Sequence, residues 1–344
     1  MSRMKQVVKR KAEMELDYQP IIMEAPVTQE SMWKSATSND NITITTWRQI
    51  WIDQAKENKK TLGNFGDYSV GQLFGLNQHK PTIIAGSGPS LVYNGEMLKD
   101  RGDVALISCL HNFHYFEDRD IPVDYYVSLD AGSVVLEEIA EGGKHDSEWY
   151  WERTKDKTLI AYVSSHPDLF KKWRGKIYVF ACPVPDKQYE EEMEKLEPFY
   201  AHISTGGNVL GACMYVAKAI LGSWVTAFVG ADFCFSYNNK FHGWDSKYDA
   251  KMGRCIRATD IYGNSVKTWQ SYANFATWFN YIAGRVPGIY INCTEGGIFG
   301  AYPDGNIFSV KQMRLQEFLN MAYMHNELKE QYLDCTVNQK KILF

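Results

Sequence analysis

Residues 81–91 read Pro-Thr-Ile-Ile-Ala-Gly-Ser-Gly-Pro-Ser-Leu, a short apolar run that leads through two glycines to a proline. The β-branched residues in Thr82–Ala85 predict a buried strand. Gly86 and Gly88 allow a tight turn directly after it, where the backbone can come close to a ligand. Pro89 suits the first turn of a helix, because its missing N–H group would have no intrahelical partner there. The stretch therefore predicts a strand, a glycine turn and a helix in succession.

This turn is a candidate phosphate site. We expect the backbone N–H groups of Ser87, Gly88 and Ser90 to converge at the positive end of the helix, where an anion is favoured. The chain lacks the Gly-x-x-x-x-Gly-Lys pattern of P-loop kinases. Leu91 stands where the dinucleotide fingerprint has its third glycine, and no acid directly follows the next apolar run, so NAD is disfavoured.

The composition of the chain excludes several classes of protein. Its 344 residues favour one large domain with appendages over two equal domains. The formal net charge of -4 shows no footprint for nucleic acid or an anionic membrane. Seven cysteines without a C-x-x-C pair favour reduced thiols. With no apolar run of membrane-spanning length, we expect a cytoplasmic protein without membrane contacts, and a homo-oligomer remains open.

Predicted strands and helices alternate along the chain. After Thr82–Ala85, strands are expected at residues 104–109, 125–129, 158–163, 177–181, 225–229 and 289–291. Helices are expected at residues 46–59, 91–99, 133–141, 188–197, 209–221, 269–282 and 310–330. The polar residues 142–156 are expected to form a surface insertion. The alternation predicts an α/β fold, a Rossmann-like, doubly wound and mostly parallel sheet with helical N- and C-terminal additions.

The same pattern divides the chain into three parts. Residues 1–79 are expected to form an N-terminal arm and helical extension, with a solvated tail up to about Asn41. Residues 80–308 are expected to form the catalytic domain. Within it, residues 236–258 lack periodicity and are long enough to form a lid over the site. Residues 309–344 are expected to form a C-terminal helical segment.

A second glycine-rich turn adds to the predicted site. Thr205, Gly206, Gly207 and Asn208 open the helix expected at residues 209–221, and either Thr205 or Asn208 is suited to cap it. Ligands of doubly wound sheets bind outside the carboxyl ends of the strands. The other candidates at such ends are Asp130, His166, Asp232, Asn292, Thr294, Glu295, Gly296 and Gly297. Two helix N-termini aimed at one crevice favour a nucleotide-activated donor as the ligand.

Seven short motifs occur between about residues 80 and 300. They are Gly86-Ser87-Gly88-Pro89-Ser90-Leu91, Ser128-Leu129-Asp130, Ser165-His166-Pro167, Gly206-Gly207-Asn208, Gly230-Ala231-Asp232 with His242, Asp260-Ile261-Tyr262-Gly263-Asn264 before a helix, and Asn292 to Gly297. In this order they resemble the MptE-like domain family, which includes 6-hydroxymethylpterin diphosphokinases of archaea and the Maf glycosyltransferases of flagellin. The Maf branch is in turn similar to bacterial sialyltransferases that use CMP-activated sugars.

The resemblance implies one leading activity. A Maf-like enzyme transfers a sugar from a CMP- or UDP-sugar to an acceptor hydroxyl without a metal or other cofactor. It needs a general base for the hydroxyl, for which His242 on the expected lid is our choice. Asp130 and Asp232 are the other catalytic candidates. The acceptor, whether protein, glycan, small molecule or nucleic acid base, is left open.

Two alternatives remain. A pterin-type diphosphokinase uses ATP and Mg²⁺, which Asp130 and Asp232 would ligate, with Glu295 as a further acid. The chain departs from that branch, because it has Ser128-Leu129-Asp130-Ala131 where the branch has an Asp-Leu-Asp-Gly type of acid pair. The second alternative is a nucleotide-binding scaffold without catalysis.

Overall fold

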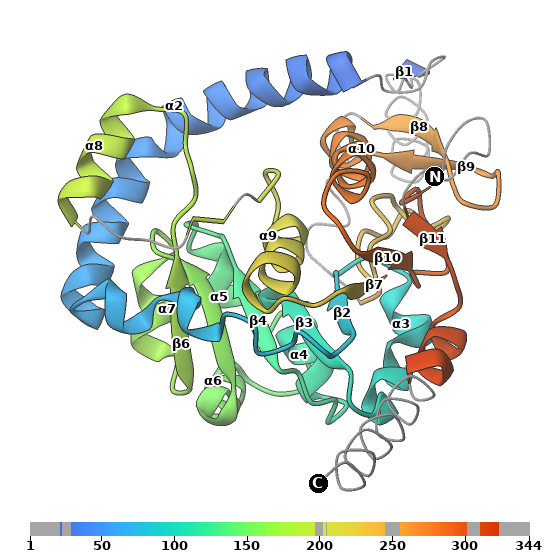
Figure 1. Cartoon of the computed structure of the whole chain (residues 1–344), viewed down its shortest axis with the longest axis horizontal. Coiled ribbons are helices and arrows are strands. Elements are labelled where there is room, and N and C mark those ends of the chain that lie inside the picture. Colours follow the sequence, from blue (N-terminus) through green and yellow to red (C-terminus); the bar gives the residue numbers. More distant parts are fainter. Residues whose placement is uncertain are drawn as a thin grey trace, which may run out of the picture.

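An eight-stranded sheet forms the centre of the protein (Figure 1). The computed structural model describes residues 21–22, 29–196, 202–203, 205–244, 255–300 and 310–322. All neighbouring strands of the sheet are parallel, in the order β11-β10-β7-β2-β3-β4-β5-β6. The strands are β2 (Thr82–Ala85), β3 (Ala105–Cys109), β4 (Tyr125–Ser128), β5 (Thr158–Tyr162), β6 (Lys176–Phe180), β7 (Val225–Val229), β10 (Ile289–Asn292) and β11 (Val310–Gln312).

The doubly wound, parallel sheet predicted from the sequence is confirmed. From β2 the chain builds β3 to β6 in one direction, and it then returns to place β7 on the other side of β2. Ile84 of β2 lies between Ile107 of β3 and Phe228 of β7, and all three side chains are buried. Strands covered on both faces are apolar throughout, which explains why these runs show no polar alternation. The strand order reverses between β2 and β7, where such folds bind ligands.

Helices flank this sheet. They are α3 (Leu91–Asn94), η3 (Gly95–Asp100), η4 (Leu110–Asn112), α4 (Phe113–Glu117), α5 (Val134–Glu138), α6 (Ser147–Arg153), α7 (Pro167–Lys172), α8 (Lys187–Leu196), α9 (Val209–Tyr215) with its π-helical continuation η6 (Val216–Ile220), and α10 (Gln270–Ala283). Helix α9 packs on β2, β3 and β4, the strands beside the reversal point. A Cβ atom on Gly211 would lie 1.8 Å from the carbonyl oxygen of Thr205, so this glycine allows the preceding turn to pack closely on the helix.

The N-terminal helix α2 (Gln29–Leu62) is much longer than the predicted helix at residues 46–59. The expectation of a solvated tail up to about Asn41 is therefore wrong from residue 29 onward, while residues 1–20 of the expected tail lie outside the described residues. The second half of α2 packs on the sheet domain: Trp51 contacts the rings of Tyr162 and Tyr189 edge to face. Asn58 Nδ2 also donates to two main-chain carbonyls at the end of β5. These tertiary contacts explain a helix whose sequence shows little amphipathic pattern.

Three other elements differ from the sequence prediction. The expected surface insertion at residues 142–156 contains α6, whose Tyr150 and Trp151 are buried. A hairpin of β8 (Ile256–Thr259) and β9 (Ser265–Thr268) was missed, and the motif at residues 260–264 is its turn. The closing helix expected from residue 310 begins at residue 315, because Val310–Gln312 pairs with β10 as the edge strand β11. Short strands at a sheet edge have too few residues to show a period.

The described part of the chain holds no helix with both the length and the apolar character that a membrane crossing needs.

Candidate functional site

A pocket lies at the reversal point of the sheet, and we call it the switch-point pocket. Its lining combines the turn after β2, the start of α9, the turn after β7 and the aromatic face of α10. The lining residues are Ser87, Gly88, Cys109, Asn208, Val209, Leu210, Gly230, Ala231, Asp232, Phe233, Cys234, Phe241, Tyr272 and Phe275. Ser87 and Gly88 of the first glycine-rich turn and Asn208 of the second therefore line one pocket.

The switch-point pocket has a volume of about 110 Å³. Pockets that enclose a whole small molecule typically measure roughly 300–1,000 Å³. The described walls thus surround one portion of a nucleotide-sized ligand, such as a phosphate or a single ring, and the remainder would extend outward.

Two N–H groups of the first glycine turn are already hydrogen-bonded, contrary to the prediction for Gly88 and Ser90. Gly88 N donates to the carbonyl of Gly230 over 2.8 Å. Ser90 N lies 3.2 and 3.3 Å from the carboxylate oxygens of Asp232, and Ser90 Oγ donates to Asp232 Oδ2 over 2.7 Å. The carboxylate of Asp232 therefore occupies the anion position that we had expected a phosphate to take at the start of α3. A phosphate-binding role for Gly86, Ser87, Gly88 and Ser90 stays a prediction.

The glycines of this turn are required by contact between two neighbouring strand ends. A Cβ atom on Gly86 would lie 2.5 Å from the carbonyl oxygen of Gly230, and one on Gly230 would lie 2.4 Å from the carbonyl oxygen of Gly86. A Cβ atom on Gly88 would lie 2.1 Å from Oδ2 of Asp232. Close backbone approach was the correct reason for these glycines, but the approaching group is the β7 turn of the same chain.

Asp232 is the acidic residue of the pocket. It is 6 % exposed, and burial raises its pKa to about 6, while the hydrogen bonds from Ser90 act in the opposite direction. The turn that presents it is strained, since Phe233 has a φ of 51°. Two threonines hold this turn: Thr294 Oγ1 accepts from Ala231 N, and Thr268 Oγ1 donates to the carbonyl of Phe233. A rigid, buried carboxyl group with a pKa near neutrality is suited to proton transfer.

The second glycine turn leads into α9 as predicted. Asn208 is the N-cap, and its Oδ1 accepts from Gly211 N over 2.9 Å. Thr205 Oγ1 instead accepts from Gly207 N within the turn. The N–H groups of Val209 and Leu210 have no intrahelical partner, because they belong to the first turn of the helix. Since both residues line the pocket, their amides are candidate donors to an anion there.

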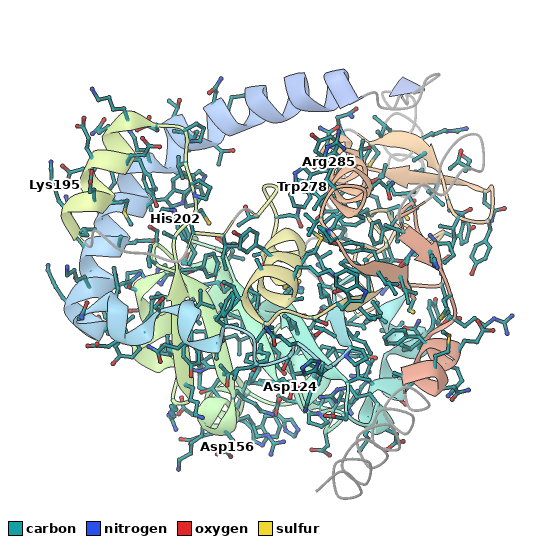
Figure 2. All side chains as sticks on the ribbon, viewed as in Figure 1. Asp124, Asp156, Lys195, His202, Trp278 and Arg285 are labelled. Carbon is teal, nitrogen blue, oxygen red and sulfur yellow. The ribbon has the colours of Figure 1, made fainter. Side chains whose placement is uncertain are left out.

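Packing by α10 explains one glycine of this second turn. Gly206 has a φ of +59°, and a Cβ atom on it would lie 2.6 Å from the indole of Trp278. Trp278 projects from α10 toward the middle of the molecule (Figure 2). The pocket lining begins at Asn208, so Thr205, Gly206 and Gly207 support the start of α9 from behind.

His242 does not line the pocket, although the sequence made it our choice of general base. Its ring is 4 % exposed and stacks on His111 with a centroid distance of 4.4 Å. Nδ1 lies 2.8 Å from the carbonyl oxygen of Ser87. Burial, followed by the neighbouring His111, lowers the pKa of His242 to about 3. The residue fastens its segment to the glycine turn and lies behind the pocket wall. The rest of the expected lid, residues 245–254, lies outside the described residues.

Asp130 and His166 lie at the carboxyl ends of β4 and β5, away from the pocket lining. Asp130 Oδ1 accepts from Gly132 N over 2.6 Å in the turn before α5. His166 caps α7, where its Nδ1 accepts from Asp168 N and Pro167 occupies the first turn. Ser133 at the N-cap position of α5 makes no side-chain hydrogen bond to that helix. Both site candidates thus stabilise local turns.

The loop after β10 supports the Asp232 turn. Asn292 Nδ2 donates to the carbonyl of Phe299, and its Oδ1 accepts from Thr294 N. Glu295 Oε1 accepts from Asn94 Nδ2 and from Leu315 N, at the start of the last described helix, and so it points away from the pocket. A nucleotide-binding role for these residues is without geometric support.

The two glycines of that loop lie closer to the site. A Cβ atom on Gly297 would lie 2.3 Å from the carbonyl oxygen of Asp232, and one on Gly296 would lie 3.9 Å from Asp232 Oδ1. Gly297 therefore permits backbone packing against the Asp232 turn, whereas Gly296 lies beside the carboxylate itself.

The donor set does not fit a magnesium ion shared by Asp130 and Asp232. Three strand-to-strand steps separate β4 from β7, which corresponds to about 14 Å at the usual spacing. Oxygen ligands of one Mg²⁺ lie only about 2 Å from the ion. Within the described residues no group of three or more His, Cys, Asp or Glu side chains is arranged to hold a metal.

Sequence reasoning missed Asn112, which supports the glycine turn from below. Its Nδ2 donates to the carbonyls of Ala85 and Gly86 and to Ser108 Oγ. It also missed the aromatic wall of Phe233, Tyr272 and Phe275. Asn112 lies just after the carboxyl end of β3, where ligands of doubly wound sheets bind, and this position is the signal that could have found it. The neighbouring sequence does not show that its side chain faces inward.

We expect Asn112→Ala to lower the free energy of unfolding by about 3 kcal/mol, because buried carbonyls lose their donor. Chemical denaturation measures this change. Gln72→Ala is the control, since the amide of Gln72 also donates to main-chain carbonyls but is exposed, and it should change stability by less than about 0.5 kcal/mol. Equal effects of the two substitutions would contradict the role of Asn112.

Comparison with known proteins assigns the chain to a family. The sequence model of the family described as 6-hydroxymethylpterin diphosphokinase MptE-like matches residues 53–238, more than half of the chain. No curated protein matches the chain. Among solved structures, the chain is similar to the MAf glycosyltransferase from Magnetospirillum magneticum AMB-1, with 16% identity and a TM-score of 0.49. The similarity covers 74% of this chain and 39% of that one, so this chain matches about two fifths of the length of that protein.

Proposed function

Since the chain belongs to the MptE-like family, we propose that it is a transferase that binds a nucleotide-activated donor at the switch-point pocket and passes a glycosyl group to an acceptor hydroxyl. The observation that supports this most strongly is the position of Asp232, a buried carboxyl group in a pocket formed by both glycine-rich turns.

In this proposal the start of α9 holds the phosphate of the donor. The amides of Val209 and Leu210 are directed to the pocket end of the helix, and they act with the positive end of its dipole. The apolar wall of Phe233, Tyr272 and Phe275 excludes water from the reacting groups. A water-poor site strengthens the attraction between the amides and the leaving phosphate.

Asp232 takes the role of general base that the sequence had suggested for His242. The acceptor hydroxyl gives its proton to the carboxylate while its oxygen bonds to the anomeric carbon of the donor, and the nucleotide phosphate leaves. A pKa of about 6 keeps the group largely ionised at pH 7.5 and still basic enough to accept a proton. His242 is unsuited to this step, because its ring is buried outside the pocket lining.

Glycosyl transfer is favoured over diphosphate transfer by the arrangement of the acids. A diphosphokinase of the pterin type would need carboxylates that converge on Mg²⁺, whereas Asp130 and Asp232 are three strands apart and Glu295 binds Leu315 N. A site with one buried acid suits base catalysis on a hydroxyl.

Titration calorimetry with CMP, UDP and ATP, each with and without Mg²⁺, tests the proposal. We expect CMP or UDP to bind without metal, and Phe275→Ala to weaken that binding at least tenfold, because the variant removes part of the pocket wall. Phe74→Ala is the matched control, since Phe74 is 71% exposed and lies outside the pocket lining.

Other outcomes would contradict the proposal. Binding of ATP only in the presence of Mg²⁺ would support the diphosphokinase instead. Binding without transfer to any acceptor, unchanged by substitution of Asp232, would support a nucleotide-binding scaffold.

A further inference from the structure

The segment Phe241-His242-Gly243-Trp244 is wedged between α10 on one side and the η4, α3 and α4 helices on the other. Phe241 lines the switch-point pocket and stacks on Tyr272 with a centroid distance of 5.3 Å. Gly243 packs so closely on α3 that a Cβ atom would lie 2.2 Å from Val92 Cγ1. Trp244 stacks on Tyr115 of α4. The wedge therefore connects the pocket wall with a cluster of rings behind it.

Three histidines gather around this wedge. His242 of the wedge stacks on His111 of η4, and Trp244 contacts His111 and His114 at centroid distances of 5.5 and 4.9 Å. The ring centroids of His111 and His114 are 6.4 Å apart. Rings this close would repel one another if more than one carried a charge. The stack is therefore compatible with neutral imidazoles.

The nitrogen atoms of the cluster show the same preference for the neutral form. Among the described residues, no hydrogen-bond partner is found for His111 Nε2, for either ring nitrogen of His114, or for Trp244 Nε1, all of which are buried. The main-chain carbonyl of Glu138 lies toward the His114 ring without completing a hydrogen bond. Burial, followed by His111, lowers the pKa of His114 to about 4. Protonation inside the closed cluster is thus strongly disfavoured.

Within the described residues, the charged groups that face the cluster do not reverse this balance. Glu138 of α5 lies 3.5 Å from His111 Nδ1. Asp118 raises and Arg119 lowers the pKa of His114, and both effects are smaller than that of burial. The glycine turn contributes the Ser87 carbonyl, which favours the protonated form of His242. From α10, the neighbouring titratable group is the phenol of Tyr272, behind Phe241.

We infer that His114 and His242, packed together with the ring of His111, form a proton-sensitive latch that holds the wedge against the glycine turn and releases it on acidification. The inference concerns the regulation of the pocket and in that respect rests on the proposed function. Release would remove Phe241 from the pocket wall and the His242 contact from Ser87. In the open segment His114 and His242 meet water and recover an ordinary pKa near 6.5. Opening therefore takes up protons, and it becomes more favourable as the pH falls below about 6.5.

Hydrogen exchange measured by mass spectrometry on the ligand-free protein tests the latch. From rates corrected for intrinsic exchange, we expect the opening constant of the peptide covering residues 233–244 to rise about 100-fold between pH 5.5 and 4.5. This corresponds to tenfold for each of His114 and His242. Peptides of the β3 strand should show no such rise, which separates local opening from global unfolding.

Two variants identify the groups responsible. His114→Phe keeps an aromatic ring beside Trp244, and His242→Gln keeps a donor for the Ser87 carbonyl, but neither replacement titrates in this range. Each single variant should reduce the rise to about tenfold, and the double variant should abolish it. A wild-type opening constant independent of pH, or the full rise in both single variants, overturns the latch.

The same measurements separate the latch from the proposed function. A pH-dependent opening in a protein that binds neither CMP nor UDP would support the latch and contradict the transferase. Nucleotide binding in a protein whose wedge opens equally at all pH values would support the transferase and contradict the latch.

Discussion

Asp232→Asn is expected to abolish transfer and at the same time to stabilise the protein. Loss of the general base should lower kcat by roughly 10²–10⁴-fold. Burial raises the pKa of Asp232 from 3.8 to about 6, so the folded state favours the protonated carboxyl group. The stability that this protonated group contributes is present below about pH 4 and is lost as the pH rises from about 4 to 6. Asparagine avoids this cost. We expect about 3 kcal/mol of added stability at pH 7.5, or about 4 °C in Tm, and no gain at pH 3.5.

Calorimetric unfolding at the two pH values, together with an assay of donor turnover, measures both effects. Asp260→Asn is the matched control, because Asp260 is equally buried but accepts from Tyr262 N and Asn264 N in the β8–β9 turn. It should bring neither a gain in stability nor a loss of transfer. If Asp232→Asn lowers Tm at pH 7.5 while transfer continues, the acid has a structural role alone.

Gly88→Ala is expected to disrupt the site and to destabilise the fold by about 3 kcal/mol. The added Cβ atom would lie 2.1 Å from Asp232 Oδ2 and 2.7 Å from the carbonyl oxygen of Gly230. The Gly230 oxygen belongs to the backbone directly after β7, a strand in the middle of the sheet. Relief requires that the β2 and β7 turns separate, which breaks the Gly88 N to Gly230 O hydrogen bond. Nucleotide binding should weaken together with stability, since both turns line the pocket.

Denaturant unfolding and calorimetric titration of the same preparation test this expectation. Gly66→Ala is the control, because its Cβ atom would meet the side chain of Asn64 at 3.4 Å, an ordinary contact distance. Its stability and nucleotide affinity should remain those of the wild type. A Gly88→Ala protein with unchanged stability would show that the two turns are not in contact.

The strands were the most accurate part of the sequence prediction. Runs such as Val225–Val229 and Thr158–Tyr162 are apolar on both faces, and only a parallel sheet covered on each side uses several such runs. Elements stabilised mainly by partners distant in sequence were harder to find. The length of α2 depends on contacts such as Asn58 with the end of β5, and β11 exists because it pairs with β10.

The sequence predicted the sheet edge at which the switch-point pocket lies, but the structure gives several candidate residues other contacts than those expected. Parallel strands bring their carboxyl ends to one edge, so the positions of both glycine-rich turns followed from the order of the elements. The roles of the individual side chains did not follow from the order of the elements. Asp130, His166 and Glu295 sit at strand ends as expected, yet each holds a local turn or a helix start.

The amino-acid sequence by itself determined the family resemblance, the doubly wound parallel sheet and the sheet edge at which the pocket lies, because these depend on residue types within short windows and on their order. Only the tertiary structure decided which groups in that edge are available. Ser90 and Asp232 are 142 positions apart in the chain, and their hydrogen bond removes an amide from the predicted phosphate site. The partner of an N–H group is set by whichever residue folding brings within about 3 Å, and no local pattern encodes that distance.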